Sequence, residues 1–276
     1  FTGSLIVGHN TTGTLSSATY NTALGIGAMD AITQGDYNVA IGYNAATTLT
    51  TGSYNILLGG LAGDALTTGS ENVAIGYAAL SSEDGNGKNI AIGTNALEDL
   101  NAGADAYNVA IGHDAGRNVT TGVRNVIIGG LAGDALTTGA NNIAIGYEAL
   151  TTEDAHGLNI AIGTNALQNL NAGADAGNVA IGISAGAQMT TGRYNNILGT
   201  YAGDALTTGW SNVAIGYLAL STEDTGSDAI AIGRNALQNQ DYNGSSYNIA
   251  IGRDAGKEVT TGTNNTIIGG LAGDAL

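Results

Sequence analysis

A short motif that ends in glycine recurs along the whole chain and constrains the fold more than any local preference. Consecutive glycines stand seventeen positions apart, except for the steps that follow Gly93, Gly163 and Gly233, which are two positions longer. A fixed period of this length is typical of solenoids, in which each repeat contacts only its neighbours. The sixteen glycines are Gly8, Gly25, Gly42, Gly59, Gly76, Gly93, Gly112, Gly129, Gly146, Gly163, Gly182, Gly199, Gly216, Gly233, Gly252 and Gly269.

Four such coils form a larger 70-residue unit, which recurs at 42–111, 112–181 and 182–251. The segment "NVIIGGLAGDALTTG" at 125–139 repeats 55–69 almost unchanged. We therefore expect a single repeat domain over 1–276. Because the chain begins at Phe1 rather than Met and stops inside a repeat at Leu276, we also expect it to be a segment of a longer protein.

Each glycine follows a predicted strand of three residues. Ile, Leu or Val stands directly before the glycine in all sixteen coils, and the residue three before it is aliphatic in thirteen. Because neighbouring strand residues point to opposite faces, this pattern predicts that these two positions are buried and that the middle residue faces outward.

Asparagine stands four residues before the glycine in fourteen coils. Stacked asparagine side chains can hydrogen-bond to each other or to the backbone at a turn. The pattern predicts a structural asparagine ladder. The members considered are Asn38, Asn55, Asn72, Asn89, Asn108, Asn125, Asn142 and Asn159.

The middle strand residue is alanine in eleven coils, and a bulkier residue replaces it once in every 70-residue unit. An exposed alanine face with a regular bulky residue is unusual for a solvent surface. We therefore expect this face to bind another copy of the chain, in a homotrimer or a filament. The alternative is that both strand faces are buried within one chain. The bulky positions are Leu57, Ile127, Ile197 and Ile267, and Ile6 is a further exception.

The segment after the glycine shows a different period. Alanine occupies the third position in fifteen coils, and "NALEDLNAG" at 95–103 favours a brief helical turn. Parallel strands stack about 4.8 Å apart whereas packed helices need about 8–10 Å, so both cannot repeat at every coil of a straight solenoid. A turn-like limb, a curved solenoid and interleaved chains would each resolve the conflict. We favour the turn-like limb.

These observations predict an all-β or mainly β fold. The expected architecture is an elongated β-solenoid of about 16 coils with 17–19 residues per coil, each with one short parallel strand and a turn or short helical limb. The composition agrees, because 45 glycines, one Phe and one Trp suit a thin core of small aliphatic side chains.

The motifs "NVAIGYNA" at 38–45 with "TTGSYN" at 50–55, and "NIAIGYEALTTED" at 142–154, resemble the tandem repeats of phage tail fibres and related viral surface proteins. The resemblance covers essentially the whole chain. A more distant one is to the head repeats of trimeric autotransporter adhesins, whose period is shorter. Both imply an elongated, extracellular and usually trimeric attachment fibre. No chaperone domain, coiled-coil stalk or receptor-binding tip is recognisable within the sequence.

The charge of the chain argues against several partners. A formal net charge of −16 with only seven basic residues disfavours nucleic acid and an anionic membrane surface. No apolar run approaches the ~20 residues that span a bilayer. We therefore expect no nucleic acid and no membrane insertion, and the absence of cysteine fixes no compartment.

No motif predicts a metal ion, a cofactor or catalysis. "GGLAGDAL" stands at 59–66, 129–136 and 269–276, at the same place of the 70-residue repeat, rather than at every ninth position, and this spacing is too wide for a calcium β-roll. His9, His113 and His156 stand at different coil positions, so no zinc site is expected.

Acidic pairs recur once in each 70-residue unit, and we expect them to form a solvated acidic edge. The pairs are Glu83 with Asp84, Glu153 with Asp154, and Glu223 with Asp224.

The sequence thus favours a non-enzymatic structural shaft of an extracellular or virion-surface attachment fibre. Its expected partner is itself, with cell-surface glycan as a further candidate. The alternative is a self-assembling extracellular filament or surface-layer protein. Ice binding by the threonine pairs and glycan processing are weaker alternatives, because the pairs occupy only two adjacent coils at a time and no carboxylate cluster lies in a groove.

Overall fold

A computed structural model describes residues 5–7, 17–153 and 155–274. It contains sixteen strands of three residues each, and the described residues include no helix. Contacts divide the chain into two compact units, Phe1–Ala140 and Asn141–Leu276, called here the N-terminal and C-terminal units. The strands are β1 (Leu5–Val7), β2 (Thr22–Leu24), β3 (Val39–Ile41), β4 (Ile56–Leu58), β5 (Val73–Ile75), β6 (Ile90–Ile92), β7 (Val109–Ile111), β8 (Val126–Ile128), β9 (Ile143–Ile145), β10 (Ile160–Ile162), β11 (Val179–Ile181), β12 (Asn196–Leu198), β13 (Val213–Ile215), β14 (Ile230–Ile232), β15 (Ile249–Ile251) and β16 (Thr266–Ile268).

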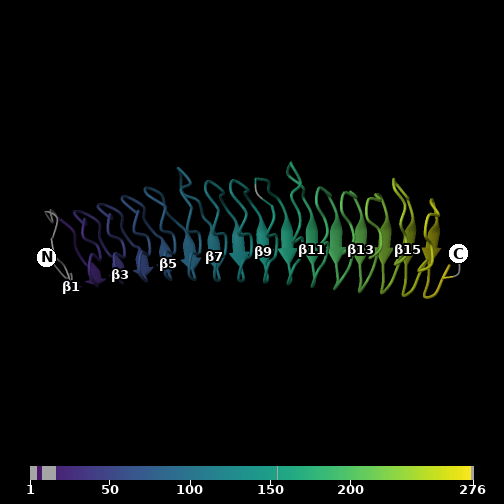
Figure 1. The fold of residues 1–276 in the computed structure, drawn as a ribbon, viewed down its shortest axis with the longest axis horizontal. Helices are drawn as coiled ribbons and strands as arrows, with labels where there is room; N and C mark the ends of the chain where they lie inside the picture. Colours follow the sequence, from purple (N-terminus) through teal and green to yellow (C-terminus); the bar gives the residue numbers. More distant parts are fainter. Residues whose placement is uncertain (1–4, 8–16, 154, 275–276) are drawn as a thin grey trace. The chain divides into compact units, whose positions relative to one another are not determined.

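Each unit is a parallel β-solenoid with one strand per coil, as the sequence predicts (Figure 1). In the N-terminal unit β1 to β8 pair in chain order, and in the C-terminal unit β9 to β16 do the same. The register keeps equivalent residues together, so that Ala40 pairs with Ala23 on one side and Leu57 on the other. Strands ~4.8 Å apart give each unit a stack of about 34 Å.

The core of each coil lies between the middle strand residue and the limb that follows the glycine. In the coil of β4, Leu57, Ala62 and Leu66 are all fully buried. The strand faces are therefore reversed from the sequence prediction, because middle residues point inward and their two neighbours face solvent. Leu57, Ile127, Ile197 and Ile267 are 0, 0, 0 and 6% exposed, so the prediction that they form an exposed contact with another copy is wrong.

A size match explains why a bulky residue recurs at the middle position. A Cβ atom added to Gly63 would lie 2.9 Å from a Leu57 methyl carbon, and one added to Gly203 would lie 3.3 Å from Ile197. In six of the eleven coils whose middle residue is alanine, such as that of Ala74, the limb instead carries a buried leucine such as Leu80. The bulky residues thus fill space that glycine leaves inside the coil.

The limb is a chain of turns and not a helix. Asn95 and Leu97 have φ angles of 56° and 50°, so the backbone visits the left-handed region at alternate residues and the predicted helical turn at 95–103 is wrong. The Leu97 N–H donates to the Ala115 carbonyl of the next coil at 3.1 Å. This turn-like limb matches the spacing of the strands and removes the conflict with helix packing.

Glycine is required where the strand meets the limb. Gly42 has a φ angle of +145°, and a Cβ atom there would overlap the carbonyl oxygen of Gly59 in the next coil. Only glycine adopts this conformation at such a close approach between backbones. This contact explains why the glycine period sets the fold.

The asparagines form a buried ladder along each unit. The Oδ1 atom of Asn21 accepts the Asn38 backbone N–H at 2.8 Å and the Asn38 Nδ2 at 3.1 Å, and that Nδ2 also donates to the Gly52 carbonyl at 2.8 Å. Bonds from a backbone N–H to the preceding Oδ1 recur in the N-terminal unit at Asn55, Asn72, Asn89, Asn108 and Asn125, and in the C-terminal unit at Asn159, Asn178, Asn195 and Asn212. Asn142 supplies the acceptor for Asn159. The ladder therefore satisfies the polar groups of the corner at which each coil enters its strand.

Candidate functional site

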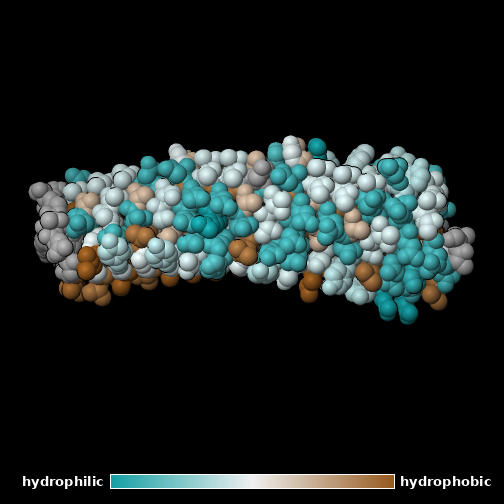
Figure 2. Space-filling view, viewed as in Figure 1, coloured by the Kyte–Doolittle hydropathy of each residue, from teal (hydrophilic) through white to brown (hydrophobic). Residues whose placement is uncertain are grey.

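The strand side of each unit presents an apolar surface, called here the sheet face. We define it as the first and third residues of the strands, which are aliphatic in nearly every coil. In the N-terminal unit Leu24, Ile41 and Ile56 are 49, 39 and 42% exposed. Figure 2 shows hydrophobic residues gathered along the strand side of this unit. Such an apolar surface is typical of an interaction site.

A tyrosine column borders the sheet face. Tyr20, Tyr37 and Tyr54 stand directly before ladder asparagines, and their rings stack with centroids 4.8 and 5.2 Å apart. Each ring is about half exposed. All three residues have left-handed φ angles, which turn the chain into the strand and direct the side chains outward. The column enlarges the apolar surface beside the sheet.

The sheet face carries little of the negative charge of the chain. The sixteen described strands contain no charged residue. Two positions of each coil border the strand, namely the residue directly before the ladder-asparagine position and the residue directly after the strand-end glycine. Of the 23 acidic residues only Glu71 and Asp228 stand at these positions, whereas four of the seven basic residues do. These basic residues are Lys88, Arg124, Arg234 and Arg253. Another molecule can therefore approach this face without strong repulsion.

The acidic pairs do not form a simple solvated edge, because the glutamate of each pair is buried. Glu83, Glu153 and Glu223 are fully buried, whereas Asp84 and Asp224 are exposed and Asp154 lies outside the described residues. Sequence reasoning failed here because it treated both carboxylates as surface groups. The sequence does contain a feature that distinguishes these glutamates, since each of them precedes one of the three longer coils.

Each buried glutamate holds the loop of the longer coil that follows it. Glu83 accepts the Asn86 N–H at 3.1 Å and the Ala102 N–H at 3.4 Å. Burial raises the pKa of this carboxyl above its ordinary value, and the hydrogen bonds from Asn86 and Ala102 partly oppose the increase. Burial also raises the pKa of Glu153 and Glu223. The role of these groups is structural, since their oxygens are occupied by donors from the protein.

The other titratable groups give no basis for a catalytic assignment. The carboxylates of Glu223, Asp224 and Asp241 lie within 4.8 Å of one another, but Glu223 already accepts the Gly226 N–H at 2.8 Å and the Gln240 amide at 3.0 Å. His113 lies beside Asp114, and His156 lies beside Glu153. His9 is outside the described residues. The structure does not bring the three histidines together in any described coil.

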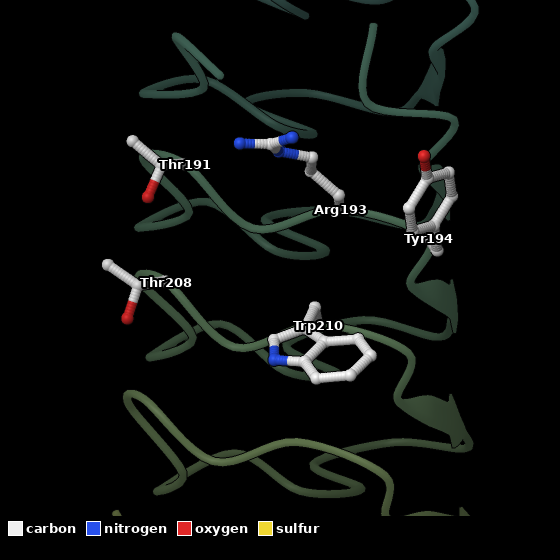
Figure 3. Close-up of a pocket in the computed structure, with 5 residues that line it drawn as sticks. All are labelled: Thr191, Arg193, Tyr194, Thr208 and Trp210. Carbon is white, nitrogen blue, oxygen red and sulfur yellow. The ribbon is translucent and has the colours of Figure 1, made fainter. Parts of the chain in front are cut away.

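One place in the C-terminal unit breaks the repeat. A groove of about 350 Å³ is lined by Thr191, Arg193, Tyr194, Thr208 and Trp210. Figure 3 shows the two threonines one above the other, with the side chains of Arg193, Tyr194 and Trp210 beside them. Trp210 and Tyr194 are 52 and 60% exposed. Sequence reasoning missed this groove, although the single tryptophan of the chain was an available signal.

No protein-family model, curated protein or solved structure matches this chain. Among the described residues, no helix has the length and apolar character needed to cross a membrane.

Proposed function

We propose that the chain is a structural shaft of an extracellular or virion-surface attachment fibre. The observation that carries this proposal is that the recurring residues contact their own equivalents in the neighbouring coils. The asparagines, the strand-end glycines and the middle strand residues all bind or pack against the same positions in neighbouring coils. Such a chain gains length by adding coils, and each coil adds stiffness through backbone hydrogen bonds.

Catalysis is the weaker proposal for this arrangement. The glutamates that recur once in each 70-residue unit are buried against backbone donors of the following loop. A general acid or base needs access to a substrate proton, which these groups lack. The recurring chemistry therefore favours a structural role.

We further propose that the shaft associates with copies of itself through the sheet face. Two aliphatic columns and the bordering tyrosines provide the apolar area, and the lack of charge in the strands removes the repulsion expected for a chain of net charge −16. This surface replaces the one expected from the sequence, since Leu57 and its equivalents lie in the core. A homotrimer fits a fibre shaft, and open-ended association fits the alternative of a filament or surface layer.

Sedimentation equilibrium over a concentration series tests both statements. The sheet-face variant Ile41→Lys, Ile56→Lys is expected to sediment as a monomer while the original chain gives a fixed multiple of that mass. The matched control is Thr68→Lys, Asp84→Lys, which changes two exposed residues on the turn side. Circular dichroism checks that each variant stays folded. A monomeric original chain would refute self-association, and growth without limit would favour the filament.

A further inference from the structure

We propose that the groove around Arg193 and Trp210 binds an acidic saccharide, through a pyranose ring that carries a carboxylate. The site is local to two coils of the C-terminal unit, and it does not depend on whether the chain forms a shaft. Three observations support it: the difference between repeats, the free polar groups of the groove, and the overall charge.

The repeat provides an internal reference for this site. In the first 70-residue unit the residues equivalent to Arg193 and Trp210 are Ser53 and Ser70, and in the second they are Val123 and Ala140. The Ser53 and Ser70 hydroxyls accept the backbone N–H groups of Asp36 and Ser53, both at 3.0 Å. Arg193 and Trp210 cannot accept such bonds through their side chains, so coil stacking does not explain their presence.

The guanidinium of Arg193 has no partner within the part of the chain that the structure describes. Three other cations are paired, since Lys88 lies 2.6 Å from Asp105, Arg117 lies 2.8 Å from Glu98, and Arg253 lies 2.9 Å from Asp254. Among the described residues, Arg234 has no such partner either. A guanidinium without a partner in the chain is available to an anionic ligand, and at Arg193 it lies beside the aromatic side chains of the groove. Its planar donors match a carboxylate, which they can bind through two parallel hydrogen bonds.

The remaining walls suit a sugar ring. Trp210 and Tyr194 present aromatic surface, against which the apolar face of a pyranose can pack. The Thr191 and Thr208 hydroxyls also lack hydrogen-bond partners among the described residues, so they are free to bind sugar hydroxyls. A volume of about 350 Å³ falls within the usual range of ligand sites.

The net charge of the chain further restricts the classes of ligand that the groove can bind. A net charge of −16 disfavours a ligand with many negative charges, such as a nucleic acid. A ligand with one carboxylate on each ring can pair one carboxylate with Arg193, and its low charge limits the repulsion from the acidic chain. The geometry therefore favours a uronic acid unit over a polyphosphate.

Fluorescence provides a direct test, because Trp210 is the only tryptophan of the chain. Titration with tetragalacturonate is expected to shift the emission in a saturable way. Maltotetraose, a neutral tetrasaccharide of pyranose rings, is expected to bind at least about tenfold more weakly. Equal binding of the two sugars, or no saturable response to tetragalacturonate, would overturn the proposal. An equal response to acetate would also overturn it, because the site would then bind any carboxylate.

Matched variants locate the binding. Arg193→Gln is expected to lower the affinity for tetragalacturonate by about tenfold or more and to leave the weak maltotetraose response unchanged. Arg117→Gln, which removes a cation outside the groove, should change neither. If Arg193→Gln binds tetragalacturonate as the original chain does, the assignment of the groove is wrong. Sedimentation of the Arg193 variant separates this result from failure of the shaft proposal, because the groove is not part of the sheet face.

A transplanted site provides a second test. The first 70-residue unit already holds Thr51, Tyr54 and Thr68 at the positions of Thr191, Tyr194 and Thr208. The substitutions Ser53→Arg and Ser70→Trp, made together with Trp210→Phe, are expected to restore a tetragalacturonate-dependent fluorescence change. A folded variant with no response would show that these five residue types do not suffice, which would contradict the proposal.

Discussion

The Nδ2 of Asn55 lies 3.0 Å from the Oδ1 of Asn38, and both side chains are completely buried. The same Nδ2 donates to the Gly69 carbonyl at 2.9 Å, while the Asn55 Oδ1 accepts the Asn72 backbone N–H at 2.9 Å. One side chain therefore satisfies polar groups in three consecutive coils. Its removal leaves buried donors and acceptors unpaired in its neighbours.

Asn55→Ala should therefore destabilise the chain by about 2–4 kcal/mol, since each unpaired buried group costs about 1–3 kcal/mol. The urea dependence of circular dichroism measures the change. Asn101→Ala, at an exposed position, is the control and should change the stability by less than about 0.5 kcal/mol. Equal stability of the two variants would show that the ladder does not stabilise the coil. Ala229 is a natural exception, because it stands at a ladder position in place of asparagine. In the segment that follows it, Gln240 occupies the position equivalent to Leu100, and its side-chain amide donates to the Ser246 hydroxyl at 3.1 Å.

Gly42→Ala should prevent stable folding or cost more than about 3 kcal/mol, because the new methyl group would overlap the Gly59 carbonyl. Gly103→Ala is a sharp control. Gly103 also has a positive φ angle, +70°, but no atom lies within 4 Å of the position of a new Cβ. Only the left-handed backbone penalises this change, by about 1–2 kcal/mol. If both variants unfold at the same urea concentration, the contact between glycines is not the cause of the glycine period.

Leu57→Ala should cost about 2–5 kcal/mol, the usual range for a buried leucine. The added methyl group of Gly63→Ala should be tolerated better in the Leu57→Ala background, because one of the two leucines that it would meet is gone and only Leu66 remains. A double-mutant cycle by urea unfolding measures this coupling. Additive effects would contradict the size match. The cycle also separates a core role for Leu57 from an interface role, which would change the sedimenting mass and leave the unfolding of a monomer unaltered.

The buried glutamates should make the stability depend on pH. Burial raises the pKa of Glu83 in the folded chain above its ordinary value of 4.5, so the folded state binds more protons than the unfolded state above that pH. The free energy of unfolding should therefore fall as the pH rises from about 4.5 through the raised pKa, and then level off. Glu153 and Glu223 add effects of the same sign.

The variant Glu83→Gln, Glu153→Gln, Glu223→Gln should show a weaker fall over this range, whatever its stability at one pH. Urea unfolding at a series of pH values measures the slope. Glu71→Gln, at an exposed carboxylate elsewhere in the chain, should keep the original slope. An unchanged slope in the triple variant would show that these carboxyls titrate alike in the folded and unfolded chain.

The parts of the fold that depend on the contact between equivalent residues could be predicted from the sequence. Gly42 and Gly59 meet directly, and so do Asn38 and Asn55, so their spacing in the chain gives the coil without knowledge of its interior. This is why the solenoid, its single strand per coil and its turn-like limb were expected.

The inward direction of the strand could not be predicted by the usual rule. In a thin coil the space behind the sheet accommodates alanine, so the larger Val39 and Ile41 face outward and Ala40 faces inward. The alternation of larger and smaller apolar residues therefore predicts the strand period correctly but assigns the wrong face of the strand to the core. The left-handed residues of the limb could not be predicted either, since leucine rarely adopts a positive φ angle and yet Leu80 and Leu97 both do so.

The groove was missed because its residues are separated in the sequence by a coil. Arg193 and Trp210 stand at equivalent positions of two successive coils and become neighbours only through stacking. A comparison of equivalent positions between the 70-residue units would have identified them, since serine, valine, threonine or alanine occupies these positions elsewhere.

The asparagine ladder also bears on how such a chain can change over generations. Each 70-residue unit presents the same acceptor at its last coil and requires the same donor at its first, so a whole unit can be duplicated or deleted by recombination without leaving any ladder bond unmade. Length then varies in steps of about 19 Å, the rise of four stacked strands. Each such event changes the number of stacked coils by four and leaves the structure of the remaining coils unchanged.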